Sequence, residues 1–221
     1  MGDAAPPGLD AGLTPGVPKW STRIMKILAG VLGAFLFAVL VVGLWAAGAY
    51  NGIVGRNEAV SKAWAAVESQ YQRRLDLIPN LVEAVKGSAK FEKETLTSVV
   101  EARSRVGSLT LDKKVLENPS SFKKFEEAQA GLSSALSRLM VVVEKYPDIK
   151  STQGFRDLSV QLEGTENRIA VARNDFNAAA QDYNTMIKMF PASFIAGLGG
   201  FKDRPYFQAA PEAAKAPPVK F

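Results

Sequence analysis

The chain of 221 residues has room for one or two small domains, and its hydrophobic (47%) and charged (22%) fractions are ordinary for a protein that folds. It contains no cysteine and no histidine, which excludes disulfides, thiolate nucleophiles, Ser-His-Asp triads and histidine-based zinc or di-iron sites. The net charge of +5 comes from 27 basic and 22 acidic residues that are interspersed, so we expect no nucleic-acid binding. We also expect no enzyme activity, no cofactor and no metal site.

The first residues predict a disordered tail over 1–20, because four prolines and four glycines interrupt any periodic pattern. The next segment, 21–50, is predicted to be a transmembrane helix. No charged residue occurs from Ile27 to Gly55, and about 20 apolar residues cross the hydrocarbon core as a helix. Aromatic residues that favour the membrane interface lie near both ends: Trp20, Trp45 and Tyr50.

A cleaved signal peptide ending at Ala47-Gly48-Ala49 is the alternative, although the apolar run is longer than the usual 7–15 residues of such peptides. The flanking charges favour a cytoplasmic N-terminus, with the following domain outside the cytoplasm. Three basic residues precede the apolar run and two follow it closely: Lys19, Arg23 and Lys26, then Arg56 and Lys62.

The fold class is predicted to be all-α, with residues 51–191 forming a long antiparallel helical bundle after the membrane helix. Strand patterns are nearly absent there. Three long helices are expected. The first covers 51–107, is continuous with the membrane helix and is kinked near Leu75–Ile78 by Pro79. The second covers 119–145, and the third covers 152–190.

Each predicted helix carries a seven-residue apolar repeat that is typical of coiled coils. In the third helix, where Ser151 or Thr152 is the expected cap, the rows are Phe155, Leu162, Ile169, Phe176, Tyr183 and Phe190, and Leu158, Thr165, Ala172, Ala179 and Met186. In the second helix, Asn118 is the expected cap and Gln129 interrupts a row of apolar residues. In the first helix, the row is Trp64, Tyr71, Ile78, Val85, Val99 and Val106, and its seven-residue step is broken only at Glu92.

Polar residues gather near Pro79, and we interpret them in two ways. They form a docking surface or an anion-binding pocket at the kink, or they are structural. In the structural interpretation, Asp76 or Asn80 bonds to backbone groups freed by the proline, and Arg74 pairs with a glutamate of another helix. The candidate residues are Arg73, Arg74, Asp76, Asn80 and Glu83.

The third helix has a polar stretch around Glu166 and Arg168. We expect Glu166 to form an interhelical salt bridge with Arg73, Arg74 or Arg103, because these carboxylates lack the spacing of known cation-binding loops. Gly164 within this helix suggests close approach by a bulky side chain such as Trp64.

The C-terminal tail, 192–221, is apolar at first and then rich in proline. Its apolar part is expected to pack on the bundle, to insert at the membrane interface or to dock on a neighbouring subunit. The candidate contact residues are Phe194, Ile195, Leu198, Phe201, Tyr206 and Phe207. The glycines at 197–200 lack the strand-turn-helix context of a nucleotide loop.

Several motifs in order along residues 45–208 resemble the LemA family: Tyr50-Asn51, Arg73-Arg74-x-Asp76-Leu77-Ile78-Pro79-Asn80-Leu81-Val82-Glu83, Glu101-Ala102-Arg103, Thr165-Glu166-Asn167-Arg168-Ile169, Tyr183-Asn184 and Pro205-Tyr206-Phe207. The resemblance implies a single-pass protein of the bacterial inner membrane with a long antiparallel bundle and no catalytic residues. It also implies links to magnetosome membranes and membrane metalloproteases. It implies an N-terminus outside the cytoplasm, opposite to the charge count.

Together these features predict a membrane-anchored scaffold of the cell envelope that contacts lipid, self-associates as a homo-oligomer and is not an enzyme. The alternative is an adaptor that recruits or regulates a membrane protease or another envelope machine. An enzyme that uses carboxylates and a bound metal is a third, less supported possibility.

Overall fold

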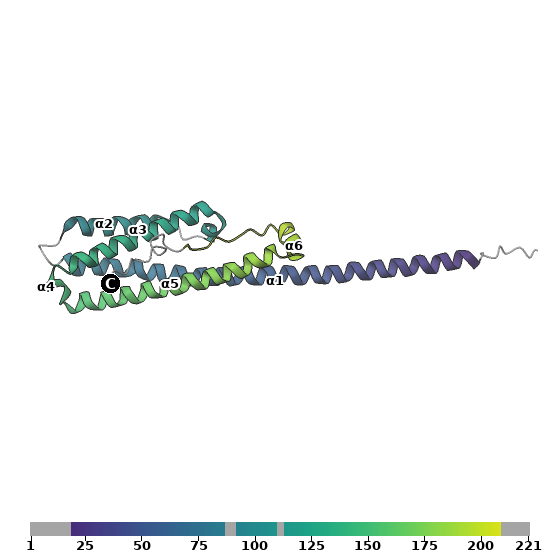
Figure 1. Ribbon diagram of the computed structural model, residues 1–221, viewed down its shortest axis with the longest axis horizontal. Coiled ribbons are helices and arrows are strands. Elements are labelled where there is room, and N and C mark those ends of the chain that lie inside the picture. The colour runs from purple at the N-terminus through teal and green to yellow at the C-terminus, as the bar shows by residue number, and fades with distance from the viewer. Residues whose placement is uncertain (1–18, 87–91, 110–112, 209–221) are drawn as a thin grey trace, which may run out of the picture. The chain divides into compact units, whose positions relative to one another are not determined.

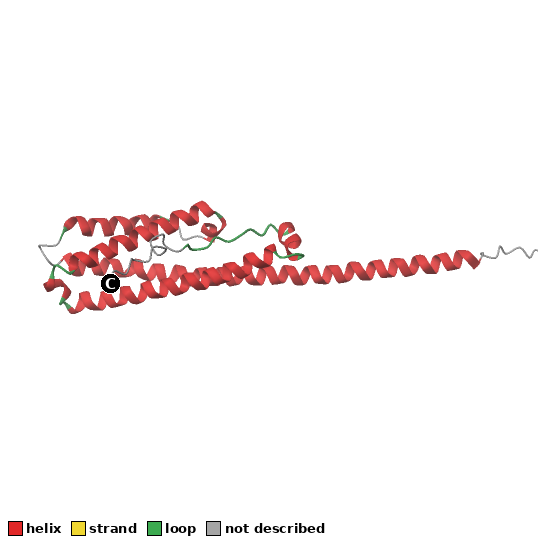
Figure 2. Ribbon diagram, viewed as in Figure 1, coloured by secondary structure: helices red, strands yellow, loops and turns green. Residues whose placement is uncertain are grey.

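The computed structural model describes residues 19–86, 92–109 and 113–208, which form helices and loops with no strand among them (Figure 1 and Figure 2). The chain falls into two compact units that divide between Ala47 and Gly48. The proline-rich end after Gln208, and the predicted disordered tail apart from its last two residues, lie outside the described residues.

The first unit contains the beginning of α1, a helix that covers Lys19–Lys86. In this unit the large apolar side chains from Ile24 to Leu44 are all exposed. The helix is long and apolar enough to cross a membrane. A helix that is apolar on every side needs an apolar environment, so this segment suits a single-pass membrane anchor.

The second unit begins within α1 and contains all the other helices. They are α2 (Lys93–Ser108), the short 3₁₀-helix η1 (Lys113–Glu117), α3 (Pro119–Val143), α4 (Pro147–Lys150), α5 (Gln153–Lys188) and α6 (Ala192–Leu198). From the second half of α1 through α2, α3 and α5, the long helices of this unit alternate in direction (Figure 1).

The predicted caps of the second and third helices are confirmed. The Asn118 side chain accepts hydrogen bonds from the backbone N–H groups of Ser120 and Ser121, and Thr152 accepts one from Phe155. These bonds satisfy N–H groups that a helix leaves without partners in its first turn. Both helices end two residues earlier than expected.

The prediction of one helix over 51–107 is wrong, because α1 ends at Lys86 and α2 begins at Lys93. Glu92, where the apolar row failed, is the N-cap residue of α2 and has an extended backbone. The break allows α2 to reverse and pack along α3, so that Val99 and Val106 are buried.

Pro79 lies within α1, which continues for seven residues beyond it. Because proline has no N–H, the carbonyl oxygen of Leu75 loses its helical donor. Arg103 of α2 supplies a replacement, since its Nε donates to the Leu75 oxygen at 3.2 Å. Arg103, rather than Asp76 or Asn80, therefore meets the backbone group freed by the proline. A kink at this point stays a prediction.

The core of the second unit consists of two clusters of buried residues that follow each other along the helices. The aromatic cluster consists of Ile53, Val60, Trp64, Val67, Tyr71, Val115, Leu116, Phe122, Phe125, Ile169, Ala172, Phe176, Ala180, Tyr183, Ile187, Ala196 and Phe207. The aliphatic cluster consists of Leu75, Ile78, Leu81, Val82, Val85, Val99, Ala102, Val106, Leu132, Leu136, Leu139, Val143, Ile149, Phe155 and Leu162.

Candidate functional site

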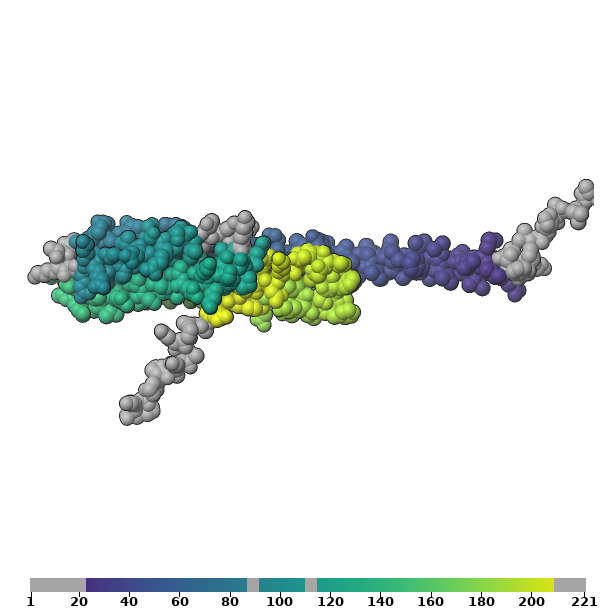
Figure 3. All heavy atoms as spheres, turned by 90° about the horizontal axis from the view of Figure 1, so that it is seen from above, coloured from purple at the N-terminus to yellow at the C-terminus, as the bar shows by residue number. Residues whose placement is uncertain are grey.

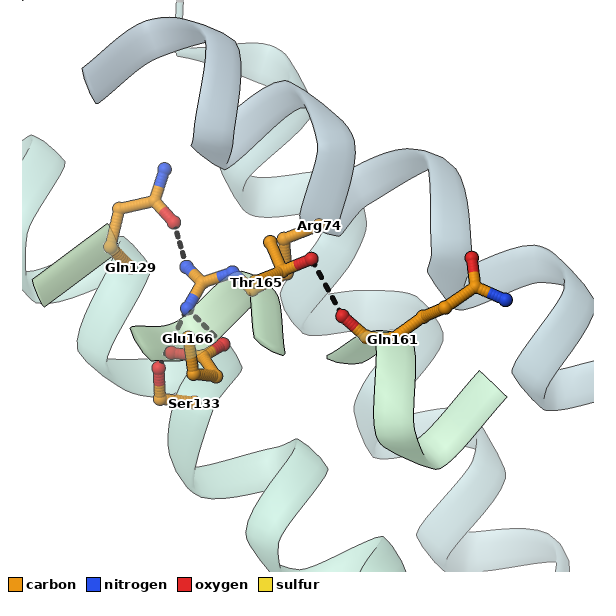
Figure 4. A network of polar contacts seen from close by, with 6 residues as sticks. All are labelled: Arg74, Gln129, Ser133, Gln161, Thr165 and Glu166. Atoms are coloured by element: carbon orange, nitrogen blue, oxygen red, sulfur yellow. Dashed lines mark hydrogen bonds and ion pairs between the residues drawn. The ribbon is translucent and has the colours of Figure 1, made fainter. Parts of the chain in front are cut away.

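Arg74 lies on α1 between Tyr71 of the aromatic cluster and Leu75 of the aliphatic cluster, and its exposed fraction is only 1%. Its guanidinium group donates to Ser133 Oγ at 2.8 Å, to Glu166 Oε1 at 2.9 Å and to Gln129 Oε1 (Figure 4). We call Arg74, Gln129, Ser133 and Glu166 the polar layer. It joins α1, α3 and α5 through one side chain.

The electrostatics of the polar layer explain why a cation is tolerated there. A buried charge is costly unless it is paired and hydrogen-bonded. Glu166 supplies the opposite charge while its own side chain is 39% exposed. The guanidinium carbon also lies 5.0 Å from the centre of the Tyr71 ring, a favourable cation–π distance. Burial raises the pKa of the Tyr71 hydroxyl, so this ring stays neutral at physiological pH.

A cleft of about 640 Å³ opens beside the polar layer, between α1, α3, α5 and the segment after α6. Its lining carries charges of both signs and several aromatic rings: Tyr71, Arg74, Pro119, Phe122, Lys123, Glu126, Glu127, Gln129, Ala130, Ser133, Glu166, Ile169, Arg173, Pro205, Tyr206, Phe207 and Gln208. A surface of this kind suits a polypeptide segment with mixed charge.

Residues 201–208 follow α6 as a segment without helix, which we call the return segment. Two asparagines of α5 hold its backbone. Asn184 donates to the Arg204 oxygen and accepts from the Arg204 N–H, both at 2.8 Å. Asn177 makes the same pair of bonds with Phe207, both at 2.9 Å. In the space-filling view, the return segment (yellow) lies against α3 and α5 (Figure 3).

Phe207 places its side chain in the aromatic cluster, where its ring contacts Trp64, Phe122 and Phe176 at centroid distances of 6.1, 4.9 and 5.4 Å. The Arg173 guanidinium covers the outer side of this ring at 4.6 Å. The return segment is therefore both part of the core and one wall of the cleft.

The structure brings together some of the predicted site residues and separates the others. Arg74 and Glu166 form the expected interhelical salt bridge and line the cleft, together with Tyr206 and Phe207. Outside the cleft, Glu83 pairs with Lys86 at 2.8 Å. The remaining polar candidates are exposed and do not line the cleft: Arg73, Asp76, Asn80 and Arg168.

The apolar candidates of the tail also divide into two sets. Phe207 is buried, and Ile195 and Phe201 pack against the aromatic cluster, which confirms packing on the bundle for these three. Phe194 and Leu198 have exposed fractions of 68% and 74%, so packing on the bundle is wrong for them.

Several contributors to the site are missing from the sequence-based candidates, among them Gln129 and Ser133 of the polar layer. Asn177 and Asn184 hold the return segment, and Arg173 also pairs with Glu126 of α3 at 3.7 Å. The seven-residue spacing of the two asparagines along α5 was an available signal. The expected approach of Trp64 to Gly164 is wrong, because a Cβ added at Gly164 meets no atom within 4 Å.

Comparisons with known proteins place these features in a family. The LemA family model matches residues 63–221. Magnetosome protein MamQ 2 of Paramagnetospirillum magneticum is 32% identical over 179 residues, which cover 73% of this chain and 65% of the relative. Magnetosome protein MamQ of Magnetospirillum gryphiswaldense is 30% identical, with the same coverage. Protein LemA of Metamycoplasma hominis is 24% identical over 92% of this chain and 87% of its own length.

The chain thus spans about two thirds of the length of its magnetosome relatives and nearly all of the mycoplasma protein. The family match includes the whole polar layer, the cleft and the return segment, and it leaves most of the apolar part of α1 outside. The chain belongs to the LemA family.

Proposed function

We propose that this protein is a membrane-anchored, non-enzymatic scaffold of the bacterial cell envelope that assembles through contacts between copies of its helical unit. The apolar N-terminal part of α1 supports the anchor. Relatives named as magnetosome proteins support a role at a membrane. The two charged side chains of the polar layer, Arg74 and Glu166, bond to each other between α1 and α5. This arrangement supports a structural role for them.

The expected route to self-association has to be revised. The apolar rows of the third predicted helix, such as Phe155, Leu162, Ile169 and Phe176, lie in the two core clusters of the same chain. They are therefore not available to a second copy. A contact between copies needs a different face of the helices.

A second repeat on the outer face of α5 carries the proposal. Six residues alternate at spacings of four and three, and they lie on the side opposite the core: Val160, Gly164, Asn167, Val171, Asn174 and Ala178. We call this row the outer seam. Val160 and Val171 have exposed fractions of 69% and 60%. A spacing of four and three residues is the pattern that packs one helix against another.

The chemistry of the outer seam suits a contact between identical helices. Its small residues allow two helix backbones to approach closely, and asparagines at seam positions fix register and partner number. Glu163 and Arg168 flank the seam on its two sides, where coiled coils form salt bridges between helices. Arg168 is thereby retained as a subunit contact.

Because the protein has no cysteine, single cysteines test the outer seam directly. We expect Val171→Cys, in membranes of cells that make the full chain, to form a dimer with a short bis-maleimide reagent. Val141→Cys is the matched control, because Val141 on α3 is similarly exposed, at 66%, and lies off the seam. Equal cross-linking of the two variants, or none at Val171, would overturn self-association through this face.

The cleft favours a second candidate function, that of an adaptor for a membrane protease or another envelope machine. Lys123 lies on the cleft, while its neighbour Lys124 does not and is exposed. An adaptor that uses the cleft should lose its partner when Lys123 is changed to Glu and keep it when Lys124 is changed to Glu.

A photoreactive residue at Ala130 in the cleft identifies what binds there. A cross-linked second protein that is lost in Lys123→Glu supports the adaptor. Cross-links only to copies of this chain support the scaffold instead.

A further inference from the structure

We propose that α6 presents an apolar face that lies in the headgroup region of the same lipid bilayer that holds α1. The proposal rests on the membrane anchor of the proposed function and goes beyond it. It assigns a second lipid contact to a segment more than 130 residues away from the anchor in sequence.

The face is defined by three large exposed side chains: Phe194 and Leu198, which lie one turn apart on α6, and Phe190, which precedes the helix. Phe190, Phe194 and Leu198 have exposed fractions of 88%, 68% and 74%. On the opposite side of α6, Ala192 and Ala196 are buried against the helical unit. We call the three exposed residues the α6 face. Soluble surfaces rarely leave such residues together and uncovered.

The position of α6 within the second unit indicates what covers this face. Phe201, three residues after α6, packs its ring 5.6 Å from the ring of Tyr50. Met186, six residues before α6, places its terminal methyl group 3.4 Å from where a Cβ of Gly52 would lie. The two chain segments that flank α6 are therefore held beside residues 50–52 of α1.

Residues 50–52 belong to the uncharged run from Ile27 to Gly55, which has 29 residues. The hydrocarbon core of a bilayer takes only about 20 helical residues. The last residues of the run therefore lie at headgroup level when α1 spans the bilayer. Because α6 is held next to them, the α6 face lies at the same level, where aromatic and apolar side chains of interfacial helices insert.

The charges around α6 agree with a lipid surface. Lys188 precedes α6 and is paired with Asp203 at 2.7 Å. Lys202 follows α6 and is exposed, so its ammonium group can meet lipid phosphates. A second copy of the chain is the competing occupant of the face. The bilayer is favoured because residues 50–52, beside which α6 is held, belong to the apolar run that enters it, whereas a second copy must be recruited.

Spin labels on single cysteines test this placement in the full chain. Phe194→Cys and Leu198→Cys are each labelled with a nitroxide and reconstituted in vesicles of phosphatidylethanolamine and phosphatidylglycerol. Collisions with oxygen, which concentrates in lipid, are compared with collisions with a nickel chelate, which stays in water. Val141→Cys is the exposed control on α3. We expect the oxygen-to-nickel ratio at 194 and 198 to exceed that of the control several-fold.

Two results would overturn the proposal while leaving the anchor intact. A ratio at 194 and 198 equal to that of the control means that water covers the α6 face. Protection from both reagents means that protein covers it, which points to a second copy. A chain that alkaline carbonate extracts from membranes overturns the anchor and the α6 contact together. A Phe190→Asp change, at a side chain already exposed, should raise nickel access at residue 198 without changing helix content.

Discussion

The aromatic and aliphatic clusters use the same three helices but differ in what closes the fourth side. In the aliphatic cluster, α2 contributes Val99, Ala102 and Val106. In the aromatic cluster, the corresponding cover includes Phe207 of the return segment and Leu116 of η1. One half is closed by a regular helix and the other by an extended segment from the end of the chain. The polar layer around Arg74 separates them.

This difference has consequences for stability. The cover of the aliphatic half follows α1 closely in sequence, so few residues have to be ordered to bring the two together. Part of the cover of the aromatic half is the return segment, which lies more than 130 positions after Trp64 and is held by asparagine side chains of α5. We therefore expect the aromatic half to depend on individual side chains more strongly.

The largest expected effect is that of Trp64→Ala, which removes the centre of the aromatic cluster. The Trp64 ring contacts four phenylalanine rings at centroid distances of 5.5 to 6.1 Å. We expect a loss of roughly 3–5 kcal/mol in the free energy of unfolding, measured by circular dichroism during denaturant unfolding in mild detergent. Val99→Ala in the aliphatic cluster is the comparison, and an equal loss there would remove the distinction between the halves.

The next effect concerns the polar layer itself. Arg74→Ala leaves Gln129 and Glu166 without their buried partner, and we expect a loss of about 3 kcal/mol. Arg73→Ala, at the exposed neighbour, should change stability by less than about 0.5 kcal/mol. Thermal unfolding of the two variants measures both losses of stability. A mild effect of Arg74→Ala would show that the layer is dispensable, and a larger effect of Arg73→Ala would reverse the assignment.

A smaller effect is expected from releasing the return segment. Asn184→Ala removes both hydrogen bonds to Arg204, with an expected loss of about 1–2 kcal/mol. Trypsin should then cleave after Lys202 at lower enzyme concentration, while the aliphatic half stays protected. Gln161→Ala on the same helix is the control, because Gln161 is exposed and lies outside the outer seam. Unchanged cleavage in Asn184→Ala would mean that the asparagine bonds do not hold the segment.

The smallest effect has the opposite sign. Gly164→Ala should stabilise α5 of the single chain by about 0.5–1 kcal/mol, because the added methyl group meets no atom of the same chain within 4 Å and alanine favours a helix. Gly200→Ala should destabilise the turn before the return segment, because Gly200 has a φ of 70°, which alanine adopts reluctantly. Differential scanning calorimetry of the two variants should show shifts in opposite directions.

Much of the helical structure could be predicted because local signals and core periodicity agree. Asn118 before Pro119 and Thr152 before α5 fix two helix starts, and the seven-residue rows identify the residues that become buried. The break between α1 and α2 was missed because the row resumed at Val99. A failure at one position, Glu92, looked like a tolerated substitution but marks the start of a new helix.

The site was predictable only in part. A salt bridge between Glu166 and an arginine of another helix was predicted, but Arg73, Arg74 and Arg103 were all candidates, and only the packing shows that Arg74 is the partner. The return segment offers no such guide, since an extended chain pinned by side chains leaves no period in its own sequence. Phe207 is buried, whereas Phe194 and Leu198 are exposed, although all three are large apolar residues of one short tail.

The paired bonds of Asn177 and Asn184 also fix the spacing of the residues that return along α5. Seven helical residues rise about 10.5 Å, and the three residues from Arg204 to Phe207 extend about 10 Å. Each asparagine amide therefore bonds to the returning backbone through one donor and one acceptor, as a backbone residue at the edge of a sheet bonds to an added strand. Adding or deleting one residue between 204 and 207 would prevent both asparagines from reaching their backbone partners at once. The length of this stretch is therefore constrained more tightly than its composition.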